Sequence, residues 1–149
     1  MIQNFHLWKA YKVECTKINQ KLKKEPKILH LWHGTRQNDP KLIYDGEVGF
    51  DMTYSAAGMW GRALYFAKNA SYSKDYSFVH PDNQRTMFLA EVLLGDYAKL
   101  GKNKSLLRPP PKPDGTPYDS VKGQTGNSDV YMVYNNCKAY PRYLVTYTV

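Results

Sequence analysis

The stretch that decides the fold of this chain is LWHGTR, residues 31–36. It follows Glu25-Pro26, where the proline disfavours a helical conformation in the residue before it. Residues 28–32 then form a short apolar run, which is typical of a buried strand. We therefore predict a strand that ends at His33 and delivers the histidine side chain to a cleft.

A second informative stretch is YFAKNASYSKDY, residues 65–76. Residues 63–67 are apolar and predict another brief strand. Either Asn69 or Ser71 can cap a short helix that ends near Tyr76, because both side chains can accept a hydrogen bond from a helix N-terminus. A strand followed at once by a short polar helix is therefore expected here.

The segment between these stretches begins with Asp39-Pro40, which is the pattern of an N-cap followed by proline at the first helical position. We predict a short helix that ends at about Tyr44. Residues 46–61 contain four glycines, which give the backbone conformational freedom. This segment is predicted to be a loop that could fold over a ligand.

The rest of the chain supplies one long helix and several strands. Loosely helical spacing over residues 2–23 predicts the helix. Residues 87–94 predict a strand, in which Glu91 is expected to face outward or to be ion-paired. Five prolines over residues 109–117 forbid regular structure in a long connection. Two further strands are expected, at residues 130–134 and 143–148. Short strands among short helices without βαβ alternation predict an α+β fold built around an antiparallel sheet.

Composition fits one domain over residues 1–149, since 42% apolar content suffices for one sizeable core but not two.

The net charge is +8, and lysines concentrate in residues 17–27. Such a run could attract nucleic acid, an anionic cofactor or an acidic protein. A solvated helix face is favoured, because Lys21, Lys23 and Lys24 have no interleaved aromatic side chains on which bases could stack.

The two cysteines, Cys15 and Cys137, show neither metal-type spacing nor a secretory context, so reduced thiols in the cytoplasm or nucleus are expected. His30 and His33 have no companion cysteine or glutamate for zinc, and no metal site is predicted.

Neither a signal peptide nor a run of about eighteen apolar residues occurs in the sequence. No membrane association is expected.

Taken in order, these motifs resemble the catalytic domain of the poly(ADP-ribose) polymerase family. The resemblance rests on Ile2-Gln3-Asn4, Leu7-Trp8, His33-Gly34-Thr35, Tyr65-Phe66-Ala67, Ser71-Tyr72-Ser73, Asp119-Ser120-Val121 and Tyr143-Leu144-Val145. One departure is Gly61-Arg62-Ala63, where the family often has Gly-Lys-Gly. The resemblance implies an ADP-ribosyltransferase fold, in which antiparallel sheets form a split sandwich with short flanking helices around an NAD+ cleft. No helical regulatory subdomain is expected.

The resemblance also implies roles in binding NAD+ as co-substrate. The histidine of the family's HGT motif, here His33, binds a ribose hydroxyl of the adenosine half, and Thr35 belongs to the same motif. The first tyrosine of YFA, here Tyr65, packs against the nicotinamide ribose. These residues would help to stabilise an oxocarbenium-like transition state as the bond to nicotinamide breaks.

Three further residues suit the nicotinamide group itself. Gly34 lacks a side chain, so its backbone can approach a carboxamide and offer it both a donor and an acceptor. The hydroxyl of Ser73 supplies another polar contact, and the aromatic face of Tyr76 can stack on the nicotinamide ring. We predict that these groups converge with His33 and Tyr65 on one cleft.

Val130 stands where the family places the glutamate of its third catalytic position, so the predicted catalytic set is His33, Tyr65 and Val130. An aliphatic side chain cannot polarise the hydroxyl that would extend a polymer. The resemblance therefore implies a mono-ADP-ribosyltransferase, which moves one ADP-ribose from NAD+ to a protein side chain. Asp129 is expected on the opposite face of the strand, and only a one-residue register slip would restore an acid.

Two alternatives stay open. The chain could be a silent module that holds NAD+ or ADP-ribose without turnover, or it could transfer ADP-ribose to a terminal phosphate of nucleic acid, which the positive charge would assist. A plug formed by residues 46–61 would favour the silent module. The acceptor, which could be the protein itself, is expected beside residues 122–128.

Overall fold

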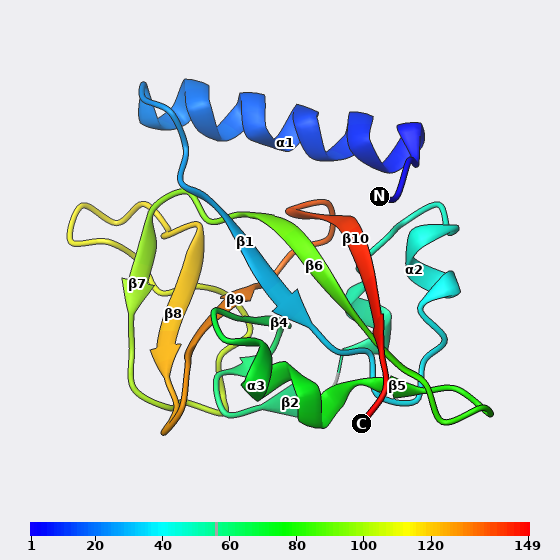
Figure 1. The fold of residues 1–149 in the computed structure, drawn as a ribbon. Coiled ribbons are helices and arrows are strands. Elements are labelled where there is room, and N and C mark those ends of the chain that lie inside the picture. The colour runs from blue at the N-terminus through cyan, green and yellow to red at the C-terminus, as the bar shows by residue number, and fades with distance from the viewer. Residues whose placement is uncertain (56) are drawn as a thin grey trace.

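The computed structural model describes residues 1–55 and 57–149 (Figure 1). Eight strands form one sheet, in which all ladders are antiparallel except the parallel pair β7–β8. The strand order is β10-β6-β1-β4-β9-β8-β7, with β5 paired to β6. The strands are β1 (Ile28–His33), β4 (Leu64–Ala67), β5 (Phe78–Val79), β6 (Arg85–Leu93), β7 (Tyr97–Lys99), β8 (Ser120–Gln124), β9 (Asp129–Val133) and β10 (Ala139–Tyr147). The predicted α+β class with a mainly antiparallel sheet is confirmed.

The sheet is divided at its centre, between β1 and β4. These strands share a single paired position, Trp32 with Ala67, and then part. Beyond that pair the ladder is replaced by a side-chain bond, in which Nδ1–H of His33 donates to the carbonyl of Tyr65 at 2.7 Å. The parting of β1 and β4 creates the opening that the predicted binding residues line.

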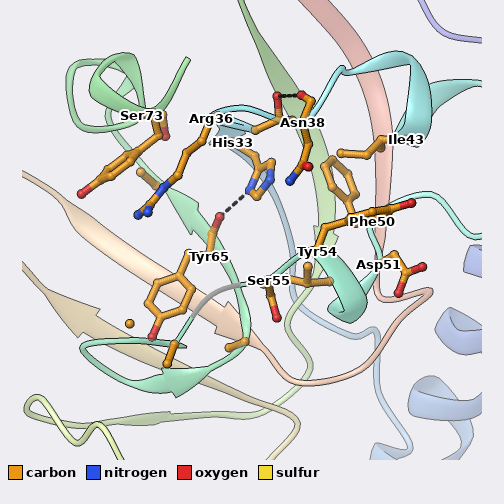
Figure 2. Close-up of a pocket in the computed structure, with 18 of the residues that line it drawn as sticks. His33, Arg36, Asn38, Ile43, Phe50, Asp51, Tyr54, Ser55, Tyr65 and Ser73 are labelled. Carbon is orange, nitrogen blue, oxygen red and sulfur yellow. Dashed lines mark hydrogen bonds between the residues drawn. The ribbon is translucent and has the colours of Figure 1, made fainter. Parts of the chain in front are cut away.

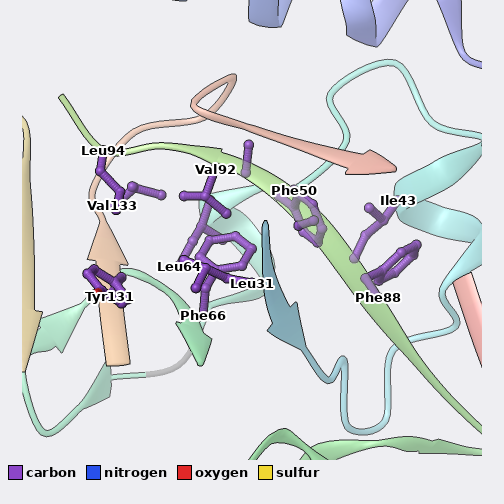
Figure 3. Packing of buried hydrophobic residues seen from close by; sticks show 12 residues of the cluster. Leu31, Ile43, Phe50, Leu64, Phe66, Phe88, Val92, Leu94, Tyr131 and Val133 are labelled. Carbon is purple, nitrogen blue, oxygen red and sulfur yellow. The ribbon is translucent and has the colours of Figure 1, made fainter. Parts of the chain in front are cut away.

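The hydrophobic core covers both faces of β9, because side chains alternate along a strand. Tyr131 and Val133 face a cluster that includes Phe66 and Phe88 (Figure 3). Val130 and Met132 face a second cluster on the opposite side. The second cluster also contains Trp60, Ala63, Ala67, Val121 and Tyr134. Strand β9 is therefore buried on both faces.

Helix α1 (Phe5–Leu22) lies across the sheet (Figure 1). Asn4 caps it, since its side-chain oxygen accepts the Leu7 N–H at 3.1 Å. The buried residues of its apolar face pack against Leu93 of β6 and Tyr140 of β10, and they are Leu7, Tyr11, Cys15 and Ile18. No helix in the described part of the chain is long and apolar enough to cross a membrane.

The lysine run at the end of α1 is more than a solvated face. Lys21 pairs with Asp119 at 2.6 Å, and Lys24 pairs with Asp96 at 3.3 Å. Both aspartates flank the β7–β8 pair, so these contacts tie the end of the helix to that edge of the sheet. Glu91 pairs with Arg142 at 3.1 Å, which agrees with the ion-paired expectation.

The predicted loop over residues 46–61 proves to be partly regular. It contains a 3₁₀ turn, η1 (Met52–Tyr54), and a hairpin of β2 (Ala57–Gly58) with β3 (Gly61–Arg62). Strands β7 and β8 were also not predicted, because strands this short carry little periodic signal and form through long-range pairing.

The short helices occur where they were expected. In front of α2 (Lys41–Tyr44), the carboxylate of Asp39 accepts the Lys41 N–H at 2.9 Å, as the capping pattern predicts. Helix α3 (Ala70–Ser73) continues into the 3₁₀ turn η2 (Lys74–Tyr76). This continuous turn holds Ser73 and Tyr76 against the end of β1.

Candidate active site

A cavity of about 670 Å³ opens where β1 and β4 part (Figure 2). The six sequence-predicted binding residues all line it, namely His33, Gly34, Thr35, Tyr65, Ser73 and Tyr76. Residues of the 46–61 segment supply the opposite wall, including Phe50, Asp51 and Tyr54. The described residues of this segment therefore wall the cavity without filling it.

Gly34 lies against the backbone of η2. A side chain at this position would meet the carbonyl oxygen of Tyr76 and come within 2.9 Å of the Ser73 carbonyl oxygen. Within the described residues, no hydrogen bond engages the Gly34 N–H, the Gly34 C=O or the Ser73 hydroxyl. One end of the cavity thus presents a backbone donor, a backbone acceptor and a hydroxyl beside the Tyr76 ring.

Tyr65 presents its ring rather than its hydroxyl. The phenol donates to the Gly61 carbonyl at 2.6 Å and accepts the Trp60 N–H at 2.9 Å. Burial raises the pKa of Tyr65. Its hydroxyl therefore fixes the β2–β3 hairpin, while the ring lines the cavity.

The backbone accommodates Gly61-Arg62-Ala63, which stands where the family often has Gly-Lys-Gly. Gly61, the first residue of β3 after the turn of the hairpin, has a φ of +84°, a conformation that favours glycine. Ala63 is not among the residues with positive φ and packs in the second core cluster at 2% exposure. The alanine strains neither the backbone nor the cavity wall.

His33 is held as a neutral imidazole with a defined orientation. Burial lowers its pKa, and the Arg36 guanidinium lowers it further, although the bond to Tyr65 offsets part of this effect. Because Nδ1–H donates to the Tyr65 carbonyl, Nε2 keeps its lone pair. The rings of Phe50 and Phe66 flank the imidazole, each 5.1 Å away between centroids. His33 therefore offers an acceptor to a hydroxyl group.

Residues 2–126 match the family described as the poly(ADP-ribose) polymerase catalytic domain. The chain belongs to this family. It is 42% identical, over 98% of its length, to a probable poly(ADP-ribose) polymerase of Dictyostelium discoideum. It is 31% identical over 99% of its length to the protein mono-ADP-ribosyltransferase PARP12 of Mus musculus, and 29% identical over 98% to PARP14 of Homo sapiens.

The chain spans less than half the length of these relatives. It covers 42% of the Dictyostelium protein, 21% of mouse PARP12 and 8% of human PARP14. Nearly all of the chain is nevertheless included in each match. The similarity therefore concerns the poly(ADP-ribose) polymerase catalytic domain.

The third position of the family's catalytic set lies under the cavity rather than in its wall. Val130 is 0% exposed, and it pairs with Ala67 of β4 and Gly123 of β8. Asp129 lies on the other face, where it pairs with Lys122 at 3.5 Å. The register contains no slip, and the expected orientation of Asp129 is confirmed.

Several cavity residues were not assigned from the sequence. Tyr72 lines the cavity while it also packs against the second core cluster, and its ring centroid lies 5.5 Å from that of Tyr76. Burial raises the pKa of Tyr72 to about 12, with Tyr76 contributing. Arg36 and Lys104 supply positive charge to the lining. Adjacency to HGT could have indicated Arg36, whereas no local pattern points to Lys104.

The neutral state of His33 predicts a pH dependence of stability. Its folded-state pKa is lower than its unfolded value of about 6.5, so the unfolded chain binds the proton more readily. Stability should therefore fall as pH decreases through the unfolded value toward the folded one. Urea unfolding of the wild type and His33→Gln over about pH 5 to 7.5 measures the difference. If the free energy of unfolding changed with pH equally in the two proteins, the assignment of His33 as a neutral imidazole would be contradicted.

Proposed function

We propose that this domain cleaves NAD+ and transfers one ADP-ribose to a protein side chain, with release of nicotinamide. The observation that carries the proposal is the set of unengaged groups around Gly34, Ser73 and Tyr76. A carboxamide needs an acceptor for its N–H and donors for its oxygen, and a nicotinamide ring needs an aromatic face. This end of the cavity offers all of these groups, because the end of β1 lies against the α3–η2 turn.

The other cavity residues suit the two riboses. The Tyr65 ring would pack against the nicotinamide ribose, because its hydroxyl is already engaged with the hairpin. Nε2 of His33 would accept a hydrogen bond from a hydroxyl of the adenosine ribose. Thr35 would act indirectly, because its hydroxyl donates to the Asn38 carbonyl at 2.7 Å and so braces the turn after Gly34.

The reaction breaks the bond between the nicotinamide nitrogen and the ribose carbon and forms a bond from that carbon to an acceptor atom. Nicotinamide leaves with the bonding electron pair, and the acceptor's proton passes to solvent. Neutral acceptors at Gly34 and His33 orient the cofactor without repelling the positive charge that develops on the ribose. The buried Val130 offers no group that could activate a ribose hydroxyl, which supports a single transfer over a polymer.

Purified protein incubated with labelled NAD+ tests the proposal through nicotinamide release and the mass added to each acceptor site. His33→Ala and Tyr65→Ala are each expected to lower both signals by at least about a hundredfold, since each removes a positioning contact to the reacting cofactor. His30→Ala is the matched control for the first variant, because His30 lies on the same strand and is exposed. Tyr143→Ala, at a partly exposed tyrosine, is the control for the second.

The outcomes separate the alternatives. One ADP-ribose unit on each modified side chain, lost with His33→Ala, would support mono-ADP-ribosyl transfer. Binding of NAD+ with neither release nor label would contradict transfer and favour a silent binding module. Label found on an added oligonucleotide instead of protein would show that the acceptor is nucleic acid and not a protein side chain. A Tyr65→Ala protein with wild-type labelling would overturn the site assignment.

A further inference from the structure

The Arg36 guanidinium lies over the ring of Tyr76, on which the proposed function stacks nicotinamide. Its guanidinium carbon is 4.5 Å from the centroid of the Tyr76 ring, which is a cation–π contact. The backbone of Arg36 is fixed to the same residue, since its N–H donates to the Tyr76 carbonyl at 2.8 Å. Its φ of +57° turns the chain back toward η2 directly after Gly34 and Thr35.

The charge of Arg36 is not neutralised by a carboxylate. Within the described residues, no ion pair involves Arg36 or Lys104, the two cations of the cavity lining. Asp51 is the acid of that lining, and its carboxylate accepts the Thr53 N–H at 2.9 Å. Figure 2 shows Arg36 and Asp51 on different sides of the cavity. The cavity therefore carries an excess of positive charge, and Arg36 is exposed.

The resting contact of Arg36 conflicts with occupancy of the site. A guanidinium and a nicotinamide ring are both flat groups that stack on aromatic faces, and they would compete for the same Tyr76 surface. In NAD+ the nicotinamide ring is itself a cation, so it repels a guanidinium at stacking distance. Arg36 must move from Tyr76 when NAD+ enters, and its fork of donors matches the oxygens of a phosphate.

We infer that Arg36 is a specificity residue. Its guanidinium leaves the Tyr76 ring when NAD+ enters and binds the diphosphate of the dinucleotide instead. This inference rests on the proposed function. NAD+ displaces the guanidinium from the Tyr76 ring but offers it two phosphates, so the new contact offsets the loss of the cation–π contact. Free nicotinamide displaces the same guanidinium and offers it nothing. Arg36 therefore favours NAD+ over the released product and limits product inhibition.

The test measures the two halves of the cofactor separately, by calorimetric titration of nicotinamide and of ADP-ribose into the intact chain. Arg36→Ala should bind nicotinamide about threefold more tightly, because the competing cation–π contact is gone. The same variant should bind ADP-ribose about tenfold more weakly, because a charge-assisted contact to phosphate is lost. Arg36→Lys should keep ADP-ribose affinity within about threefold of wild type, because it retains the charge.

Lys74→Ala is the matched control, because it removes one positive charge from η2 at a residue outside the cavity lining. It should leave both affinities unchanged. Nicotinamide binding that is equal or weaker in Arg36→Ala would overturn the exchange, as would unchanged ADP-ribose binding. If the wild type bound neither half-ligand, the proposed function would fall together with the inference. If the wild type bound both and Arg36→Ala altered neither, the inference alone would fail.

Discussion

Gly34→Ala is expected to reduce nicotinamide release by more than about a hundredfold, since misplacement of a positioning group costs that much. The added methyl group would meet the Tyr76 carbonyl oxygen and approach the Ser73 carbonyl oxygen to 2.9 Å. Both of these atoms belong to backbone, which cannot rotate away as a side chain can. The end of β1 must therefore separate from η2, and Gly34, Ser73 and Tyr76 lose their common geometry.

The measurement is the kcat/KM for NAD+ cleavage, together with the thermal midpoint. Gly101→Ala is the matched control, because a methyl group there meets no atom within 4 Å, its φ is not positive and it lies outside the cavity lining. This control should retain wild-type activity. A Gly34→Ala enzyme with kcat/KM close to wild type would show that the carboxamide binds elsewhere in the cavity.

Val130→Glu is expected to destabilise the domain by about 3 kcal/mol or more without producing a polymerase. Val130 is 0% exposed and packs with Trp60 and Met132 in a cluster of apolar and aromatic side chains. A carboxylate placed there loses hydration and gains no cation, so its pKa would rise and the folded state would hold it protonated. Restoring the family's glutamate therefore requires changes in the surrounding core.

The sign of the pH dependence distinguishes this mechanism from a simple loss of packing. The unfolded chain ionises the new glutamate above about pH 4.3, whereas the folded chain does not, so the destabilisation should grow as pH rises. Val130→Gln has a similar shape and no charge, and it should show no such growth. Urea unfolding of both variants measures the difference. A stable Val130→Glu protein that forms poly(ADP-ribose) would contradict this account.

Part of the candidate site could be predicted from local sequence. The apolar run before His33 and the brief strand at Tyr65 were identified because each is short, apolar and bounded by turn residues. Asp39 was recognised as a cap because it precedes a proline, a pattern that depends on neighbouring residues alone. The orientation of Asp129 followed from the two-residue period of a strand. All of these features concern contacts within a few residues.

Other parts of the site depend on pairings far apart in sequence. Strand β7 is three residues long and exists because it pairs with β8, more than twenty positions later. The β2–β3 hairpin is held by the Tyr65 hydroxyl, and a tyrosine gives no sign in the sequence of which backbone groups it will bind. Short elements such as these have little intrinsic preference, so tertiary contacts decide them.

The sequence by itself determined the order of the main elements, the α+β class and six of the residues that line the cavity. The elements and the class follow from apolar periodicity and capping patterns, which are local properties of the chain, and the six residues follow from motifs that resemble the family. Only the tertiary structure showed that β1 and β4 share a single pair, that Val130 lies beneath the cavity, and that Arg36 covers Tyr76. The physical reason is that burial and side-chain stacking arise from long-range packing, which no short segment encodes.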